Sequence, residues 1–186
     1  MVQNVENVHS YLKIYMRNII IVILLFVWQT SSAQKSDDIQ LANEYFLNAE
    51  FEKAQDLYSS LADDPKNISI IHTNYLKLLV DLKDYKTAEK YLKRIIKIFP
   101  RNIYYQIDQG ILLREQGQEL EANKTLDDII SGNKGNQHVM RQVSQYFLNK
   151  RYYELALKTL IASRESSKSL DLHALELANV YRFVGK

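Results

Sequence analysis

The sequence predicts an all-α chain of repeated antiparallel helix pairs, and two observations carry that prediction. Ala54, Ala88, Ala122 and Ala156 stand at equal intervals of 34 residues, each within a similar local sequence. A fixed period of this length is typical of helical repeat arrays. The 186 residues include only 5 Gly and 2 Pro, a composition that favours helices over sheets or disorder.

The repeat frame follows when the marker alanine is placed at position 20 of each 34-residue unit. Residues 35–186 then divide into repeats 35–68, 69–102, 103–136 and 137–170, with a partial repeat at 171–186. Position 8 is small in most repeats, and position 11 is large and apolar throughout. The small residues at position 8 are Ala42, Gly110, Ser144 and Ala178. Two prolines, Pro65 and Pro100, stand near repeat ends.

This pattern closely resembles the tetratricopeptide repeat (TPR) family, whose repeats have small residues at positions 8 and 20. The resemblance implies two antiparallel helices per repeat, which cross closely at these two positions. The residues expected to pack at the crossings are Ala42, Ala54, Ala88, Gly110, Ala122, Ser144, Ala156 and Ala178. In the second repeat we expect helices at about 68–82 and 85–98, because Pro100 cannot continue a helix.

Some positions depart from the pattern. Ser163 replaces a large apolar residue at position 27, so we expect a weaker contact between the fourth and fifth repeats. Gly132 and Gly135 stand where the third repeat lacks its proline, which indicates a helix stop. The sequence ends within the fifth repeat, so we expect it to be part of a longer protein.

Residues 1–33 lie outside the repeat frame and resemble a secretory signal peptide. Lys13 and Arg17 precede an apolar run at 19–28, and Ser31 and Ala33 supply the small residues of a cleavage site. We therefore expect export, cleavage after Ala33 and a periplasmic or cell-envelope location. The alternative is an uncleaved membrane anchor, and in that case this segment alone would contact the membrane.

The composition gives no sign of catalysis. The chain has no cysteine, which excludes disulfides, thiolate metal sites and cysteine nucleophiles. No two of the four histidines have the helical spacing of a metal pair. The formal net charge is +2 with both signs interleaved, which argues against a nucleic-acid surface. We predict no catalytic residues, no metal and no cofactor.

The TPR resemblance also implies that the first helices of the repeats line a concave groove. The groove residues expected to contact a partner are Asn43, Asn74, Lys77, Tyr104, Ile107, Asp108, Ile111, Arg114, Arg141 and Gln145. Tyr104, Ile107 and Ile111 share one helix face and would form an apolar strip. A clamp for peptide carboxylates, which some TPR proteins have, is not supported, because Ile39, Tyr104 and Asp108 replace its cations.

Two functions are compatible with these features. The first is a non-catalytic scaffold that binds a protein or peptide ligand in the groove. The alternative is the extracytoplasmic sensor region of a larger signalling protein, such as a histidine kinase, whose catalytic part would lie beyond Lys186. A second apolar run of about 20 residues further along the chain would favour the sensor.

Overall fold

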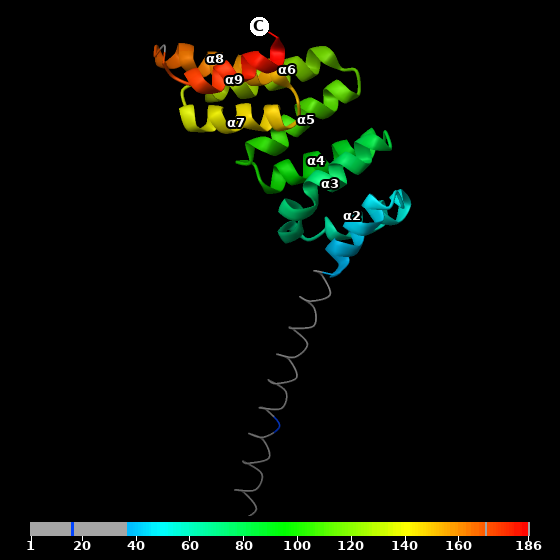
Figure 1. The fold of residues 1–186 in the computed structure, drawn as a ribbon. Helices are drawn as coiled ribbons and strands as arrows, with labels where there is room; N and C mark the ends of the chain where they lie inside the picture. The colour runs from blue at the N-terminus through cyan, green and yellow to red at the C-terminus, as the bar shows by residue number, and fades with distance from the viewer. Residues whose placement is uncertain (1–15, 17–36, 170, 186) are drawn as a thin grey trace, which may run out of the picture. The chain divides into compact units, whose positions relative to one another are not determined.

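The computed structural model describes residue 16, residues 37–169 and residues 171–185 (Figure 1). Every regular element in these ranges is helical, and no strand forms among them. The predicted all-α, TPR-like α-solenoid of antiparallel helix pairs is confirmed. Apart from Met16, the predicted signal or anchor segment lies outside the described residues.

The helices alternate between the two members of each pair. The first members are residues 37–47, α3 (Ile68–Asp81), α5 (Ile103–Glu115), α7 (Gln137–Asn149) and α9 (Ala174–Val184). The second members are α2 (Phe51–Leu61), α4 (Tyr85–Ile98), α6 (Glu119–Asn133) and α8 (Tyr153–Ser167). A short 3₁₀ helix, η1 (Pro65–Asn67), precedes α3. The bounds of α3 and α4 agree with the expected ones to within one residue.

The chain divides into two compact units, one ending at Leu78 and the other beginning at Leu79. The first unit holds helix 37–47, α2, η1 and most of α3. Its core includes Tyr58, which is fully buried and whose ring centre lies 5.7 Å from that of Tyr75. The buried Asn67 amide donates to the Leu61 carbonyl at 2.9 Å, which joins the end of α2 to the start of α3.

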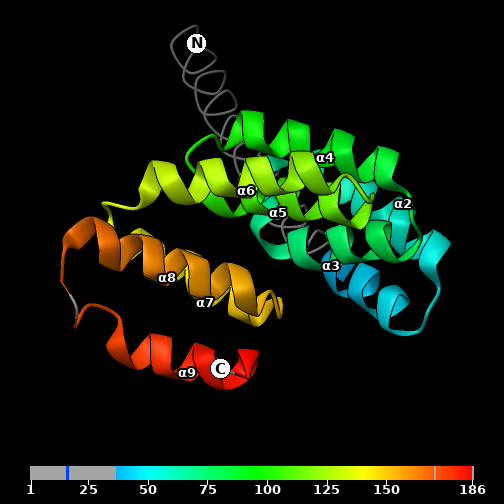
Figure 2. The same cartoon turned by 90° about the horizontal axis from the view of Figure 1, so that it is seen from above.

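The second unit contains α4 to α9. Helix α5 packs against α4 and α6, and α8 packs against α7 and α9 (Figure 2). Large apolar side chains from α5 to α9 form one buried cluster, whose members include Ile107, Leu126, Ile130, Met140, Val143, Phe147, Leu160, Leu177 and Val180. Because each helix buries only one stripe on its neighbours, stability comes from stacking successive pairs.

Short polar side chains fix where several helices begin. Asp84 accepts a hydrogen bond from the Thr87 amide, Asn102 accepts one from Tyr104 and Asn136 accepts one from Val139. Each bond satisfies an amide that has no partner within its own helix. The end of α4 is also determined by nearby residues, because Pro100 follows the C-cap residue Phe99 and cannot continue the helix.

The turn inside each helix pair has one residue in the left-handed region. These residues are Ala49, Lys83, Gly117, Arg151 and Gly185, at successive intervals of 34 residues. All five stand at position 15 of the repeat frame. A positive φ is easy for glycine and costs other residues roughly 1 kcal/mol or more. The tight turn therefore recurs even where the sequence does not supply glycine.

The small residues at positions 8 and 20 are buried in the first four repeats. Ser144 Oγ donates to the Ala156 carbonyl at 3.2 Å, so α7 and α8 approach closely at these two positions. A Cβ at Gly110 would lie 2.7 Å from Cδ2 of Leu126, which shows a similar approach between α5 and α6. The expectation for Ala178 is wrong, because this residue is exposed. No second helix follows α9 among the described residues to cover it.

Candidate functional site

The groove residues of the first unit are joined by hydrogen bonds. Asn43 Oδ1 accepts from Asn74 Nδ2 at 2.8 Å and from the Tyr58 hydroxyl at 2.6 Å. Burial raises the pKa of Tyr58, so its hydroxyl stays protonated and donates at neutral pH. These bonds link helix 37–47 to α2 and α3. Lys77 is exposed on α3.

In the second unit, side chains from α5 and α7 form a polar cluster around one carboxylate. The Tyr146 hydroxyl donates to Asp108 Oδ2 at 2.7 Å, and Lys150 Nζ lies 3.0 Å from Asp108 Oδ1. The ring centres of Tyr104 and Tyr146 are 4.8 Å apart. Lys150 Nζ also lies 5.0 Å from the centre of the Tyr146 ring. The cluster therefore joins the first helices of neighbouring repeats.

Two residues of the predicted groove are unable to contact a partner. Ile107 is fully buried within the apolar cluster of this unit, and Asp108 is only 1% exposed. Both were expected at the groove surface, and both expectations are wrong. Asp108 is covered because its carboxylate lies against Tyr146 of α7 and Lys150, and Ile107 is covered because it packs into the apolar cluster of α5 to α9. Ile111 is half-buried and packs against the same cluster.

The electrostatics of the cluster favour structure over acid–base chemistry. Burial raises the pKa of Tyr146 well above its usual range, and the negative charge of Asp108 raises it further. Tyr146 therefore remains a neutral hydrogen-bond donor at physiological pH. Its proton serves to satisfy a buried carboxylate, which would be costly to leave without partners.

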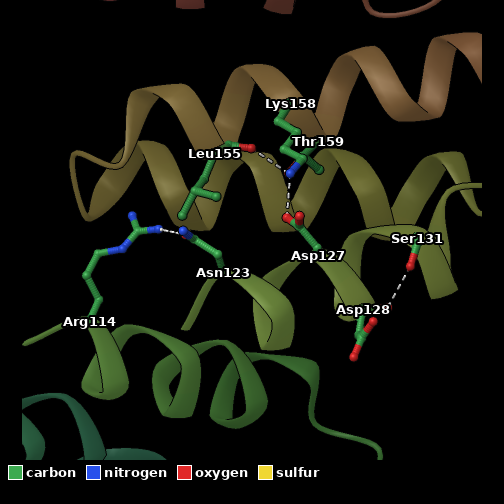
Figure 3. A network of polar contacts seen from close by, with 8 residues as sticks. All are labelled: Arg114, Asn123, Asp127, Asp128, Ser131, Leu155, Lys158 and Thr159. Atoms are coloured by element: carbon green, nitrogen blue, oxygen red, sulfur yellow. Dashed lines mark hydrogen bonds and ion pairs between the residues drawn. The ribbon is translucent and has the colours of Figure 1, made fainter. Parts of the chain in front are cut away.

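Arg114 is also occupied within the fold. Its Nη2 donates to Asn123 Oδ1 at 2.6 Å (Figure 3), and its Nε lies 3.5 Å from a carboxylate oxygen of Glu119. The guanidinium carbon lies 5.7 Å from the centre of the Tyr152 ring. Arg114 thus links α5 to the start of α6 and to Tyr152, the residue before α8.

One ion pair, shown in Figure 3, joins two of the second helices, because Lys158 on α8 pairs with Asp127 on α6. Beside it, Thr159 donates to the Leu155 carbonyl at 2.7 Å within α8. Both members of the ion pair are about half exposed, with side-chain exposures of 52% and 47%. Ion pairs this exposed contribute little to stability.

In the second unit, the exposed residues of the predicted groove lie on α7. Arg141 Nε lies 2.8 Å from Oε1 of Glu176 on α9, yet the arginine side chain remains 56% exposed. Gln145 is exposed, and its amide bonds to Asn149 one helical turn further along. These two side chains are accessible to another molecule, in contrast to Ile107 and Asp108.

A pocket of about 740 Å³ opens at the N-terminal ends of α5 and α7. Its lining residues are Phe99, Pro100, Arg101, Asn102, Ile103, Tyr104, Asn133, Val139 and Gln142. The loop between α4 and α5 forms one wall, and the end of α6 with the first turns of α7 forms another. The volume lies within the usual range of ligand pockets, roughly 300–1,000 Å³.

The sequence predicts Tyr104 at the binding surface but does not predict a contribution from the loop at 99–102. The wall formed by Phe99 and Pro100 follows from the helix stop at the end of the second repeat. Pro100 predicts the end of a helix, but a helix end does not by itself predict a binding surface. Its charge pattern offered a further signal, because the residues on either side of Pro100 include cations without carboxylates.

The described residues hold no arrangement typical of a metal centre or a membrane span. In residues 37–169 and 171–185, no three His, Asp or Glu side chains come together in a way that could hold a metal ion. Within the same described part of the chain, each helix is too short or too polar to cross a bilayer.

Comparison with known proteins adds one relative. No protein-family model matches the chain. The chain is 25% identical over 150 residues to a TPR repeat-containing protein of Methanocaldococcus jannaschii. The match covers 80% of this chain and 26% of that protein, so the chain spans about a quarter of the relative's length. The similarity supports a TPR-like chain.

Proposed function

We propose that this chain is a non-catalytic scaffold that binds a peptide segment or a helix of another protein. The observation that carries the proposal is the pocket at the starts of α5 and α7, a hollow that the packing of the repeats leaves open. TPR-like repeats generally mediate protein–protein contacts, and the similarity to a TPR repeat-containing protein agrees with such a role.

The proposed binding surface runs from the pocket along the exposed side of α7. Tyr104 and Gln142 belong to the pocket lining, and Arg141 and Gln145 continue the surface along the helix. Tyrosine and arginine are common anchors of protein interfaces, because each combines a large contact area with polar groups. Ile107 and Asp108 act from beneath this surface by holding α5 against α7.

We also propose that the protein is exported and processed after Ala33. The support is the sequence of residues 1–33, with its basic flank, apolar run and small residues before Gln34. Mass spectrometry of the native protein should find Gln34, or its cyclised form, at the N-terminus. A protein that keeps Met1 or Met16 in the cytoplasm would contradict this proposal.

A site-specific crosslink tests the scaffold function. A photoreactive amino acid replaces Gln142 at the pocket in the full chain, and the matched control replaces Lys124, an exposed residue near the middle of α6. Irradiation in cells should give partner adducts at position 142 and few at position 124. Mass spectrometry identifies the adduct, and the partner is then purified.

The second step measures the affinity of the purified partner for the chain. The double variant Tyr104→Ala with Gln142→Ala should bind at least tenfold more weakly, because it removes two contacts of the pocket. Circular dichroism and the melting temperature show whether the variant is folded. Equal adduct yields at the two positions, or an unchanged affinity in a folded variant, would contradict the proposed function.

A further inference from the structure

The pocket residues belong to two stretches of sequence that contain cations and no carboxylates. Residues 90–107 include five Lys or Arg and no Asp or Glu, and residues 129–153 include four and none. The whole chain is nearly balanced, with 24 basic and 22 acidic residues. The positive charge is therefore concentrated in the segments that meet at this site.

Several of these cations are neutralised by carboxylates from elsewhere in the second unit. Lys93 pairs with Glu89, Lys150 with Asp108 and Arg141 with Glu176, so the charge of these three cations is partly balanced within the fold. The remaining cations include two beside the pocket itself, described next.

Two exposed cations, Arg101 and Lys134, stand at or directly beside the pocket lining and are called the rim here. Arg101 is one of the lining residues, and Lys134 directly follows the lining residue Asn133. Both side chains are exposed, and neither pairs with a carboxylate of the described residues. The rim therefore offers uncompensated positive charge to an incoming molecule.

The centre of the pocket is apolar. Phe99, Pro100, Ile103 and Val139 are its aliphatic or aromatic lining residues beside Tyr104, and Asn102 is already occupied as the cap of α5. An apolar centre with a charged rim is the usual anatomy of a specific protein interface. Such a site binds a large apolar side chain and places charges of the opposite sign around it.

From this arrangement we infer that the pocket binds an acidic segment of a partner protein, which inserts a large apolar or aromatic side chain between Ile103 and Val139. Asp or Glu residues on either side of this anchor meet Arg101 and Lys134. The inference rests on the proposed scaffold function and adds the chemistry of the partner.

The lining favours a protein segment over a nucleic acid. Single strands bind through bases that stack on free aromatic faces. Here the ring of Tyr104 already lies against Tyr146, and that of Phe99 lies 6.0 Å from Tyr105. The chain's own residues 1–36 are also unsuitable as the occupant, because they carry three cations and a single carboxylate.

Random peptides displayed on phage test the inference when they are selected on the immobilised full chain. We expect the selected peptides to be enriched at least threefold in Asp and Glu around an aromatic residue or leucine. One selected peptide is then synthesised with a fluorescent label. Its affinity should fall about tenfold when the anchor is changed to alanine, and it should also fall as salt is raised.

Two matched double variants locate the site. Arg101→Glu with Lys134→Glu reverses the rim charge, and Lys86→Glu with Lys124→Glu makes the same charge change at exposed positions on α4 and α6. The first variant should bind the peptide about tenfold more weakly, and the second should stay within about twofold of wild type. Since all four residues are exposed, both variants should keep the wild-type melting temperature.

Each other outcome overturns the inference in a recognisable way. Selected peptides that are neutral or basic would overturn the partner chemistry while leaving the scaffold function standing. If no peptide is selected but crosslinks form at position 142, the partner chemistry is wrong and the scaffold function still stands. If neither selected peptides nor crosslinks are found, the scaffold function is wrong as well. Two further controls test other occupants of the pocket, namely a labelled oligothymidine as a single-stranded nucleic acid and a second copy of this chain, detected by sedimentation. If either one binds the wild type and the rim variant does not bind it, that molecule is the occupant and the acidic peptide is wrong.

Discussion

Ser163 Oγ lies 3.1 Å from Nε2 of His173, and both side chains are buried. Ser163 is on α8, and His173 is the left-handed residue that immediately precedes α9. The sequence led us to expect a weak contact here, because serine replaces a large apolar residue. The structure shows a hydrogen bond in its place, and α9 packs against α8.

Replacing Ser163 with alanine should destabilise the second unit. The change leaves Nε2 of His173 buried without its partner, which typically costs about 1–3 kcal/mol. The matched control is Ser166→Ala, an exposed serine on the same helix, which should stay within about 0.5 kcal/mol of wild type. Urea unfolding followed by circular dichroism measures both. Equal midpoints for the two variants would show that the bond contributes nothing.

The stability of the chain should fall as the pH drops below about 6.5. Burial lowers the pKa of His173, and the nearby Arg141 adds to the effect while Glu176 opposes it. The unfolded chain therefore binds a proton at a pH where the folded chain does not, and acid favours unfolding. The stabilisation is complete above the ordinary histidine pKa of about 6.5 and is lost as pH falls toward the lower, folded value.

The variant His173→Asn isolates this effect, because asparagine tolerates the left-handed backbone at this position. Unfolding free energies are compared between pH 7.5 and pH 5. The wild type should lose more stability over this range than the variant, by at most about 1.4 kcal/mol per pH unit for a single proton. Parallel profiles would mean that His173 titrates normally in the folded chain.

Two glycine-to-alanine changes should have opposite signs. At Gly110 the new Cβ would meet both Cγ and Cδ2 of the buried Leu126, and overpacking of this kind typically costs about 1–3 kcal/mol. This cost should exceed the gain of about 1 kcal/mol that alanine brings to a helix. At Gly132, also in a helix, the Cβ meets open space, so the gain should appear. A rise in melting temperature for both variants would contradict the close approach at Gly110.

Removing the cation beside Asp108 should be costly. Lys150→Ala leaves a carboxylate that is 1% exposed without its charged partner, and breaking such a pair typically costs about 3 kcal/mol. The control Lys124→Ala changes an exposed lysine and should cost little. In the background Asp108→Asn, which removes the buried charge, Lys150→Ala should cost less than half as much. Additive losses in this double-mutant cycle would show that the two residues are not coupled.

The helix pairs were predictable because their signals are local. The proline after α4 and the capping Asp84 act within a few residues of their own position, and the alanines at position 20 pack against the adjacent helix of the same repeat. A single sequence shows such signals directly. The left-handed residues Lys83 and Arg151 were less visible, since neither is a glycine and the turn imposes its backbone on them.

The candidate site was harder to predict because it depends on which side chains meet between repeats. Tyr104 and Asp108 are one helical turn apart on the same face of α5. Asp108 is nevertheless buried by Tyr146 and Lys150, while Tyr104 stays half-buried. The pocket combines a loop, a helix end and a helix start from different repeats. The position of its walls depends on how these parts pack against one another, and the 34-residue period of the sequence does not predict that packing.

The contacts between neighbouring repeats also bear on how the chain is made. The bond from Tyr146 to Asp108 joins residues 38 apart, and the bond from Gln116 to Glu89 joins residues 27 apart. Partners this close along the chain emerge from the ribosome within seconds of each other, at roughly 5–20 residues per second. The second unit can therefore add one helix pair after another during translation, and each pair shields the apolar face of the pair before it.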